Sequence, residues 1–111
     1  MRIPIIAGNW KMNLTIKQAL EFVDSIKEQV SGTDVEVLIC APFTMLKDLK
    51  EKTKGTNIKI GAQNMHFEES GAFTGEVSAP MLNEIGIDYV IIGHSERRQY
   101  FAETDETCNK K

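Results

Sequence analysis

The sequence has 111 residues, 13 of them basic and 16 acidic, and its formal net charge of −3 argues against nucleic acid or an anionic membrane as the main partner. No apolar run approaches the roughly 18 residues of a membrane span, and the apolar run at the N-terminus is too short for a signal peptide. Two cysteines without metal-site spacing argue against a structural zinc ion, so we expect one domain, or part of one, in a reduced, cytosolic protein.

The first predicted unit is a strand followed by a loop and a helix. Residues 3–8 form an apolar run bounded by glycine, which predicts a strand. Thr15 and Gln18 fit a capping box, in which the threonine caps the helix and the glutamine binds back to it. Apolar residues continue at helical spacing as far as Val30, and Gly32 is typical of a helix C-terminus.

The same unit then repeats. Strands are predicted at 35–40, 58–62 and 89–92, and helices at 44–52 (capped by Thr44), 78–86 (capped by Ser78), 95–100 and from Thr104 or Asp105 onward. The β-branched run at 89–92 predicts a strand that is buried on both faces. Because no hairpin signal separates the strands, they should be parallel and joined by helical crossovers. An open doubly wound sheet and part of a closed (β/α)₈ barrel both fit this pattern.

The polar residues of interest follow the predicted strands. In either architecture ligands bind at the carboxyl ends of the strands. Six polar or ionisable side chains fall at those ends: Asn9, Lys11, Gln63, Asn64, His94 and Glu96. The first crossover has no G-x-G-x-x-G pattern, which counts against a dinucleotide-binding fold. The sequence therefore predicts a ligand site at this edge of the sheet.

Two of these residues suggest chemistry. His94 precedes a predicted helix, whose N-terminus disfavours a positive imidazolium, so a neutral ring could donate a hydrogen bond to a carbonyl oxygen. A histidine that merely binds a loop carbonyl fits the local sequence as well. Lys11 lies between Trp10 and Met12 and could be a partly desolvated cation for an anionic ligand. A plain solvated lysine is the alternative.

Other polar residues favour structural roles. Glu96 could be a general base, but its neighbours Arg97 and Arg98 favour an ion pair. The stretch from Gly93 to Arg97 resembles a nucleophile elbow only in part, because its last glycine is replaced and no downstream base follows. His66 lies in a polar loop and is expected to be exposed. The loop at 71–76 carries an aromatic residue. It could be a flexible surface loop, or it could protrude and bind a partner through that residue.

Four motifs together resemble the N-terminal half of triosephosphate isomerase. They are Ala7-Gly8-Asn9-Trp10-Lys11-Met12-Asn13, Ala62-Gln63-Asn64, Gly71-Ala72-Phe73-Thr74-Gly75-Glu76 and Ile92-Gly93-His94-Ser95-Glu96-Arg97-Arg98. They occur in that family's order and spacing, and the likeness covers the whole chain. The resemblance implies that residues 1–111 are the N-terminal half of a single TIM-barrel domain, with four of eight β/α units.

The resemblance also implies an activity and roles for single residues. The family interconverts dihydroxyacetone phosphate and glyceraldehyde 3-phosphate through an enediolate, in glycolysis and gluconeogenesis, without a metal or organic cofactor. Its match gives His94, Lys11 and Glu96 catalytic roles: His94 as the neutral electrophile, Lys11 as the charge facing the phosphate and the enediolate, and Glu96 as the partner of Lys11. Asn9 and Ser95 join Lys11 as substrate-binding residues.

The same likeness predicts an assembly. The loop that contains Phe73 and Thr74 matches the family's dimer loop, which inserts beside the neighbouring subunit's site, so a homodimer is expected.

Part of the family's pattern is missing from these residues. The catalytic glutamate, the closing lid and the late phosphate-binding loops have no counterpart, and residues 103–111 stop inside a helix, which suggests a truncation. We expect the isolated chain to be inactive and to self-associate through its exposed sheet edges. A non-catalytic half-barrel that acts by binding or assembly is the alternative, and a flavodoxin-like open sheet is a more distant one.

Overall fold

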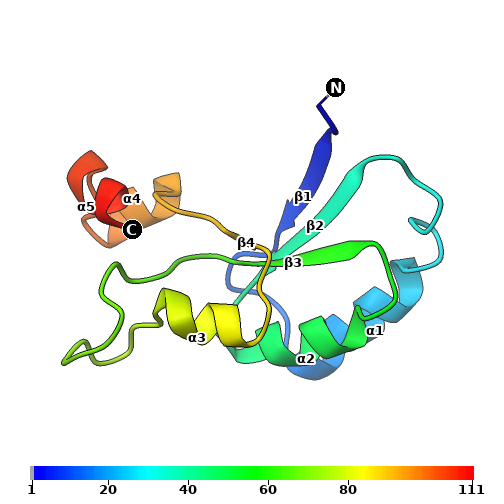
Figure 1. The fold of residues 1–111 in the computed structure, drawn as a ribbon, viewed down its shortest axis with the longest axis horizontal. Coiled ribbons are helices and arrows are strands. Elements are labelled where there is room, and N and C mark those ends of the chain that lie inside the picture. The colour runs from blue at the N-terminus through cyan, green and yellow to red at the C-terminus, as the bar shows by residue number, and fades with distance from the viewer. Residues whose placement is uncertain (1) are drawn as a thin grey trace.

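The computed structural model describes residues 2–111, which form a single parallel sheet with helices (Figure 1). The strands are β1 (Ile5–Asn9), β2 (Glu36–Ala41), β3 (Ile58–Ala62) and β4 (Tyr89–Val90), and the helices are α1 (Ile16–Ile26), the 3₁₀ turn η1 (Phe43–Met45), α2 (Leu46–Lys52), α3 (Ala79–Glu84), α4 (Ser95–Tyr100) and α5 (Asp105–Lys110). The strand order is β1-β2-β3-β4 and every pair is parallel. This order shows no reversal among the described residues, so it contradicts a flavodoxin-like sheet.

The hydrophobic core lies between one face of the sheet and the helices α1, α2 and α3, which Figure 1 shows together on one side of the strands. Its buried side chains are Ala19, Val23, Ile39, Ala41, Met45, Leu46, Leu49, Ile58, Ile60, Ala62 and Leu82. Alternate residues of β2 and β3 face this core, as the period of two in a strand requires. Strand pairing and apolar burial thus hold the first three β/α units together.

The helix boundaries confirm some predictions and correct others. The Thr15–Gln18 capping box is present, but α1 ends at Ile26 instead of Val30. Beyond Ile26 the chain forms turns, and the side chain of Gln29 donates to the backbone carbonyl of Ser25. Thr104 opens α5 with a second capping box, as one of the two predicted starts.

Two residues predicted as helix N-caps, Thr44 and Ser78, make no capping hydrogen bond through their side chains. Thr44 does not cap α2, because it lies inside η1 and α2 begins only at Leu46. Ser78 is the N-cap residue of α3, but its side chain makes no capping hydrogen bond. Its buried hydroxyl has no partner among the described residues.

The outer strands are less buried than the sequence suggests. β4 comprises only Tyr89 and Val90, both half-buried, and Ile92 beyond it is 39% exposed. The prediction of a strand buried on both faces was wrong, because β4 pairs with β3 alone within residues 2–111. At the opposite edge Ile6 of β1 is 64% exposed. The expectation that both outer strands leave apolar surface uncovered is confirmed for the described residues.

The two C-terminal helices differ from the others. Neither α4 nor α5 contains a buried residue, and Figure 1 shows them (orange and red) standing apart from α1, α2 and α3. The α4–α5 pair is therefore positioned by something other than the core.

No helix within residues 2–111 is both long enough and apolar enough to cross a membrane. Cys40 is buried, and burial raises the pKa of its thiol.

Candidate active site

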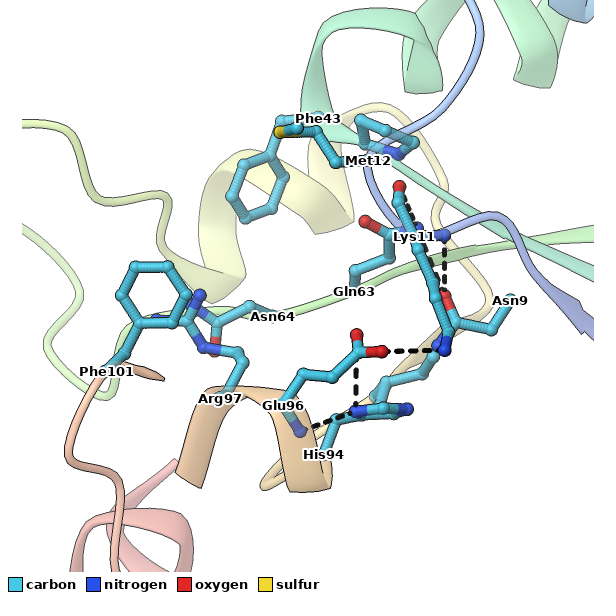
Figure 2. Close-up of a pocket in the computed structure, with 12 residues that line it drawn as sticks. Asn9, Lys11, Met12, Phe43, Gln63, Asn64, His94, Glu96, Arg97 and Phe101 are labelled. Carbon is cyan, nitrogen blue, oxygen red and sulfur yellow. Dashed lines mark hydrogen bonds and ion pairs between the residues drawn. The ribbon is translucent and has the colours of Figure 1, made fainter. Parts of the chain in front are cut away.

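A pocket of about 330 Å³ opens at the carboxyl ends of the strands (Figure 2). All six polar residues that the sequence predicts at this edge line it: Asn9, Lys11, Gln63, Asn64, His94 and Glu96. They come from β1, from the loops after β1, β3 and β4, and from α4, so the predicted convergence is confirmed. Asn9 and Lys11 lie on one side of the pocket in Figure 2, and Asn64 lies on the other.

The loop after β1 is held by amide groups. Asn9 Oδ1 accepts hydrogen bonds from the backbone N–H of Lys11 at 3.0 Å and from Gln63 Nε2 at 3.2 Å. Gln63 Nε2 also donates to the carbonyl oxygens of Lys11 at 2.9 Å and Cys40 at 3.1 Å. Lys11 has a positive φ of 56°, a strained conformation for a residue other than glycine. This network turns the backbone so that the lysine side chain enters the pocket.

Lys11 and Glu96 form an ion pair across the pocket, with Nζ 2.6 Å from Oε1. The hydrogen bond from Lys11 lowers the pKa of the Glu96 carboxyl, which is therefore an ionised partner and a poor candidate for a proton-accepting base near neutral pH. The pair of Glu96 with Lys11 that the resemblance implied is confirmed, whereas Glu96 does not pair with Arg97 or Arg98, because Arg97 pairs with Glu103 and Arg98 with Asp105. The Lys11 side chain is 53% exposed, so it is not desolvated.

The ring of His94 is held at the start of α4 through its Nδ1 atom. His94 is the N-cap residue of α4, and its Nδ1 accepts the backbone N–H of Glu96 at 3.0 Å. A nitrogen that accepts a hydrogen bond carries no proton, so the ring proton resides on Nε2. Gly93 positions the ring: its φ is +68°, and a Cβ there would lie 2.6 Å from Cys108 Sγ. The Nε2–H group is thus the donor available to a ligand.

The pocket also contains residues that the sequence analysis did not select. Arg97 and Phe101 line it, and the guanidinium carbon lies 4.5 Å from the centre of the phenyl ring. Helical spacing could have indicated both residues, because Arg97 follows His94 by three residues and Phe101 follows Arg97 by four, which places them on one face of a helix. Met12, Pro42, Phe43 and Ile91 complete the lining. The apolar lining residues were overlooked because only polar residues at the strand ends were considered.

Comparison with known proteins identifies this constellation. The family model described as triosephosphate isomerase matches residues 4–111. The chain belongs to the triosephosphate isomerase family. It is 64% identical over 111 residues to the triosephosphate isomerase of Alkaliphilus oremlandii, covering 100% of this chain and 45% of that protein. It is 65% identical over 107 residues to that of Acetivibrio thermocellus, covering 96% and 43%.

A solved structure confirms the fold. The crystal structure of triosephosphate isomerase from Bartonella henselae superposes with a TM-score of 0.90 at 45% sequence identity, covering 97% of this chain and 45% of that one. The four β/α units are therefore units of a TIM barrel, as the resemblance implied. The chain spans about half the length of the triosephosphate isomerases that it matches.

The remaining residues that the resemblance selected lie outside the pocket. Ser95 is the exposed first residue of α4 and does not line the pocket. Phe73 and Thr74 lie in the exposed loop between β3 and α3. The prediction for His66 was wrong: its ring is half-buried, with ring centroids 4.4 Å from both Phe67 and Phe73. The loop is thus packed on itself around this histidine.

No group of three or more histidine, cysteine, aspartate or glutamate side chains able to hold a metal ion occurs in the part of the chain that the structure describes. Within residues 2–111 the pocket lining contains one imidazole, the ammonium group of Lys11 paired with the Glu96 carboxylate, the Arg97 guanidinium group paired with Glu103, and three amide side chains. Such a set suits a small ligand that is anionic or becomes anionic as it reacts.

Proposed function

We propose that this chain supplies the N-terminal half of the active site of a triosephosphate isomerase, within a single TIM-barrel domain whose N-terminal half is residues 1–111. The reaction is the aldose–ketose interconversion of dihydroxyacetone phosphate and glyceraldehyde 3-phosphate. The observation that carries the proposal is the hydrogen bond from Glu96 N–H to His94 Nδ1 at 3.0 Å, which leaves Nε2–H for the substrate. No cofactor is needed for this chemistry.

The geometry suits an enediolate intermediate. As a proton leaves the carbon next to the carbonyl group, negative charge develops on the substrate oxygen atoms. His94 Nε2–H donates to these oxygens, and the ammonium group of Lys11 stabilises the charge and the phosphate. Glu96, at 2.6 Å from Lys11 Nζ, holds the lysine at the pocket. Asn9 fixes the backbone from which Lys11 extends. The role of Ser95 would be indirect, because its side chain is not in the lining.

The proton transfer itself requires groups outside this half. The resemblance places the catalytic glutamate, the lid and the remaining phosphate-binding loops in the other half of the family's barrel. The 111-residue chain alone should therefore be inactive. A half-barrel that acts only by binding or assembly is the second candidate, and the exposed apolar surface of β1 favours it for the isolated chain.

The proposed partner is a second subunit in a cytosolic homodimer. Phe73, in the β3–α3 loop next to Thr74, is 42% exposed even though its ring packs against His66. An exposed loop with an aromatic side chain suits insertion into a neighbouring subunit. Neither nucleic acid nor membrane is part of the proposal.

The test is turnover by an assembled enzyme. The chain is mixed with the C-terminal part of the Alkaliphilus oremlandii protein that it does not match, and conversion of dihydroxyacetone phosphate is measured. We expect no turnover by either part alone and turnover by the mixture. In the mixture His94→Gln should lower kcat about 10²- to 10³-fold, as loss of one preorganised donor does. Lys17→Gln, an exposed lysine on α1, is the matched control.

Two results would contradict the proposal. Turnover by the chain alone would show that residues 1–111 contain the complete machinery. An assembled mixture without turnover, or one in which His94→Gln behaves like Lys17→Gln, would favour the binding or assembly module.

A further inference from the structure

The most buried charges of the described residues lie behind the pocket, not in it. The side chains of Glu103 and Lys111 are 6% and 7% exposed, and Lys111 Nζ lies 2.7 Å from Glu103 Oε2. Arg97 Nε donates to the same carboxylate oxygen. Lys111 Nζ also donates to Asn64 Oδ1 at 2.8 Å. These four residues are called the Glu103 cluster below.

The cluster connects two walls of the pocket. Asn64 follows β3 and Arg97 belongs to α4, and both line the pocket, whereas Glu103 and Lys111 do not. Figure 2 shows Asn64 and Arg97 side by side, opposite Lys11. The path from Asn64 through Lys111 and Glu103 to Arg97 therefore fixes α4 relative to the end of β3.

No buried apolar side chain of α4 or α5 performs this task. Neither α4 nor α5 contributes a buried residue, so the core does not hold them. The other polar contacts to them are more exposed: the side chains of Lys11 and Glu96 are 53% and 43% exposed, and Arg98 pairs with Asp105, which is 95% exposed. Exposed ion pairs contribute little, because water and salt screen them, whereas breaking a buried pair leaves an uncompensated charge.

We propose that Glu103 and Lys111 are positioning residues, which hold α4, and with it His94 and Glu96, in place at the pocket. The placement of α4 is a claim about this chain alone, and only its consequence for catalysis rests on the proposed function. The Glu103 carboxylate lies between Lys111 and Arg97, so it also keeps the Arg97 guanidinium group at the wall of the pocket, over Phe101. Burial acts to raise the pKa of Glu103, but the hydrogen bonds from Lys111 and Arg97 outweigh it and lower that pKa, so the carboxylate is charged near neutral pH.

Hydrogen–deuterium exchange of the 111-residue chain tests the proposal. Glu103→Gln keeps the shape of the side chain but leaves Lys111 without its counter-charge. We expect amide exchange in residues 94–101 to become about tenfold faster or more, with a smaller rise at residues 63–66, while α1 and β2 stay unchanged. Asp105→Asn, which breaks the exposed pair in the same two helices, is the matched control and should change neither segment.

A second variant and a second signal separate positioning from mere stability. Lys111→Met removes the other partner, and the Glu103→Gln/Lys111→Met double variant should exchange more slowly at residues 94–101 than Glu103→Gln, because the buried ammonium group is gone and only the more exposed Arg97 guanidinium is left without its carboxylate. The ¹⁵N chemical shift of His94 Nδ1 should move in both single variants, since its hydrogen bond to Glu96 N–H loosens, and stay fixed in Asp105→Asn.

Three outcomes would overturn the proposal. Glu103→Gln could match Asp105→Asn at residues 94–101, or its effect could remain within residues 103–111. Both single variants could instead unfold the core, which would make the cluster a support of the whole fold. None of these readouts needs turnover, so they distinguish failure of this inference from failure of the proposed activity.

Discussion

The first three β/α units and the C-terminal helices α4 and α5 are held in place by different interactions. In the first three β/α units, side chains such as Leu49 and Ile60 are fully buried in one apolar cluster. In α4 and α5 no residue is buried, and the groups that reach across to other elements are charged or amide side chains. Apolar burial is non-directional and sets stability, whereas ion pairs and hydrogen bonds fix direction.

The pocket lies where these two regions meet. Asn9 ends β1, which pairs with β2, and Gln63 follows β3, which packs in the core, whereas His94, Glu96 and Arg97 belong to or flank α4. The position of one catalytic wall relative to the other is therefore decided by a few polar contacts. We expect substitutions in the core to change stability, and substitutions in the α4–α5 region to change the geometry of the pocket.

The largest effect is expected in the core. Leu49→Ala removes a fully buried side chain on α2 and should lower the free energy of unfolding by about 2–5 kcal/mol, since the cavity is filled only in part. Urea denaturation followed by circular dichroism measures the loss. Met12→Ala, at a side chain that is 93% exposed, is the control and should lie within about 0.5 kcal/mol of the unaltered chain. Equal losses in the two variants would refute the assigned core.

A smaller effect is expected where the core meets β4. Asp88 Oδ2 accepts hydrogen bonds from Lys50 Nζ at 2.8 Å and from Ile60 N–H at 3.0 Å. Burial acts to raise the pKa of Asp88, but these two hydrogen bonds outweigh it and lower that pKa. Asp88→Asn should cost about 1–3 kcal/mol at neutral pH, because hydrogen bonds to a charged group are lost.

The pH dependence of this contact follows from the sign of the pKa shift. The carboxylate is more acidic in the folded chain, so its stabilisation is complete above the unfolded pKa of roughly 4 and is lost as pH falls through the folded value. The difference between Asp88→Asn and the unaltered chain should shrink in acid. A difference that stays constant from neutral to strongly acidic pH would contradict the ion pair.

The next effect concerns one helix end. Thr15→Ala removes the capping box of α1 and should lower the free energy of unfolding by about 1 kcal/mol. Thr44→Ala, at an exposed threonine of η1 whose side chain makes no capping hydrogen bond, is the control. Thermal denaturation distinguishes them. An unchanged midpoint in Thr15→Ala would show that the cap adds nothing to a helix already held by Ala19 and Val23.

The smallest effect on stability is expected at the pocket. Glu96→Gln breaks the half-exposed pair with Lys11, which salt already screens, so the free energy of unfolding should barely change at low salt and not at all at high salt. Denaturation at the two salt concentrations measures this. A large, salt-independent loss would show that the pair, and not the Glu103 cluster, holds α4.

The sequence predicts the fold and the location of the pocket through local rules. Apolar runs, caps and the alternation of strands and helices place Asn9, Gln63 and His94 at the ends of parallel strands before any contact is known. The hydrogen bond between Lys111 and Asn64 could not be predicted, because these residues are 47 positions apart and meet only through the path of the chain. Burial of the His66 ring was missed because the nearby Glu68 and Glu69 indicated a polar loop, and its contact with Phe73 arises only from the folding of that loop.

The most direct test of this account is the ¹⁵N spectrum of the His94 imidazole at neutral pH, assigned with a His66→Gln variant. The account predicts a ring with its proton on Nε2, and an Nδ1 whose chemical shift reports a hydrogen bond accepted from Glu96 N–H. A proton on Nδ1 would remove the donor from the pocket. That result would contradict both the polar placement of α4 and the role proposed for His94.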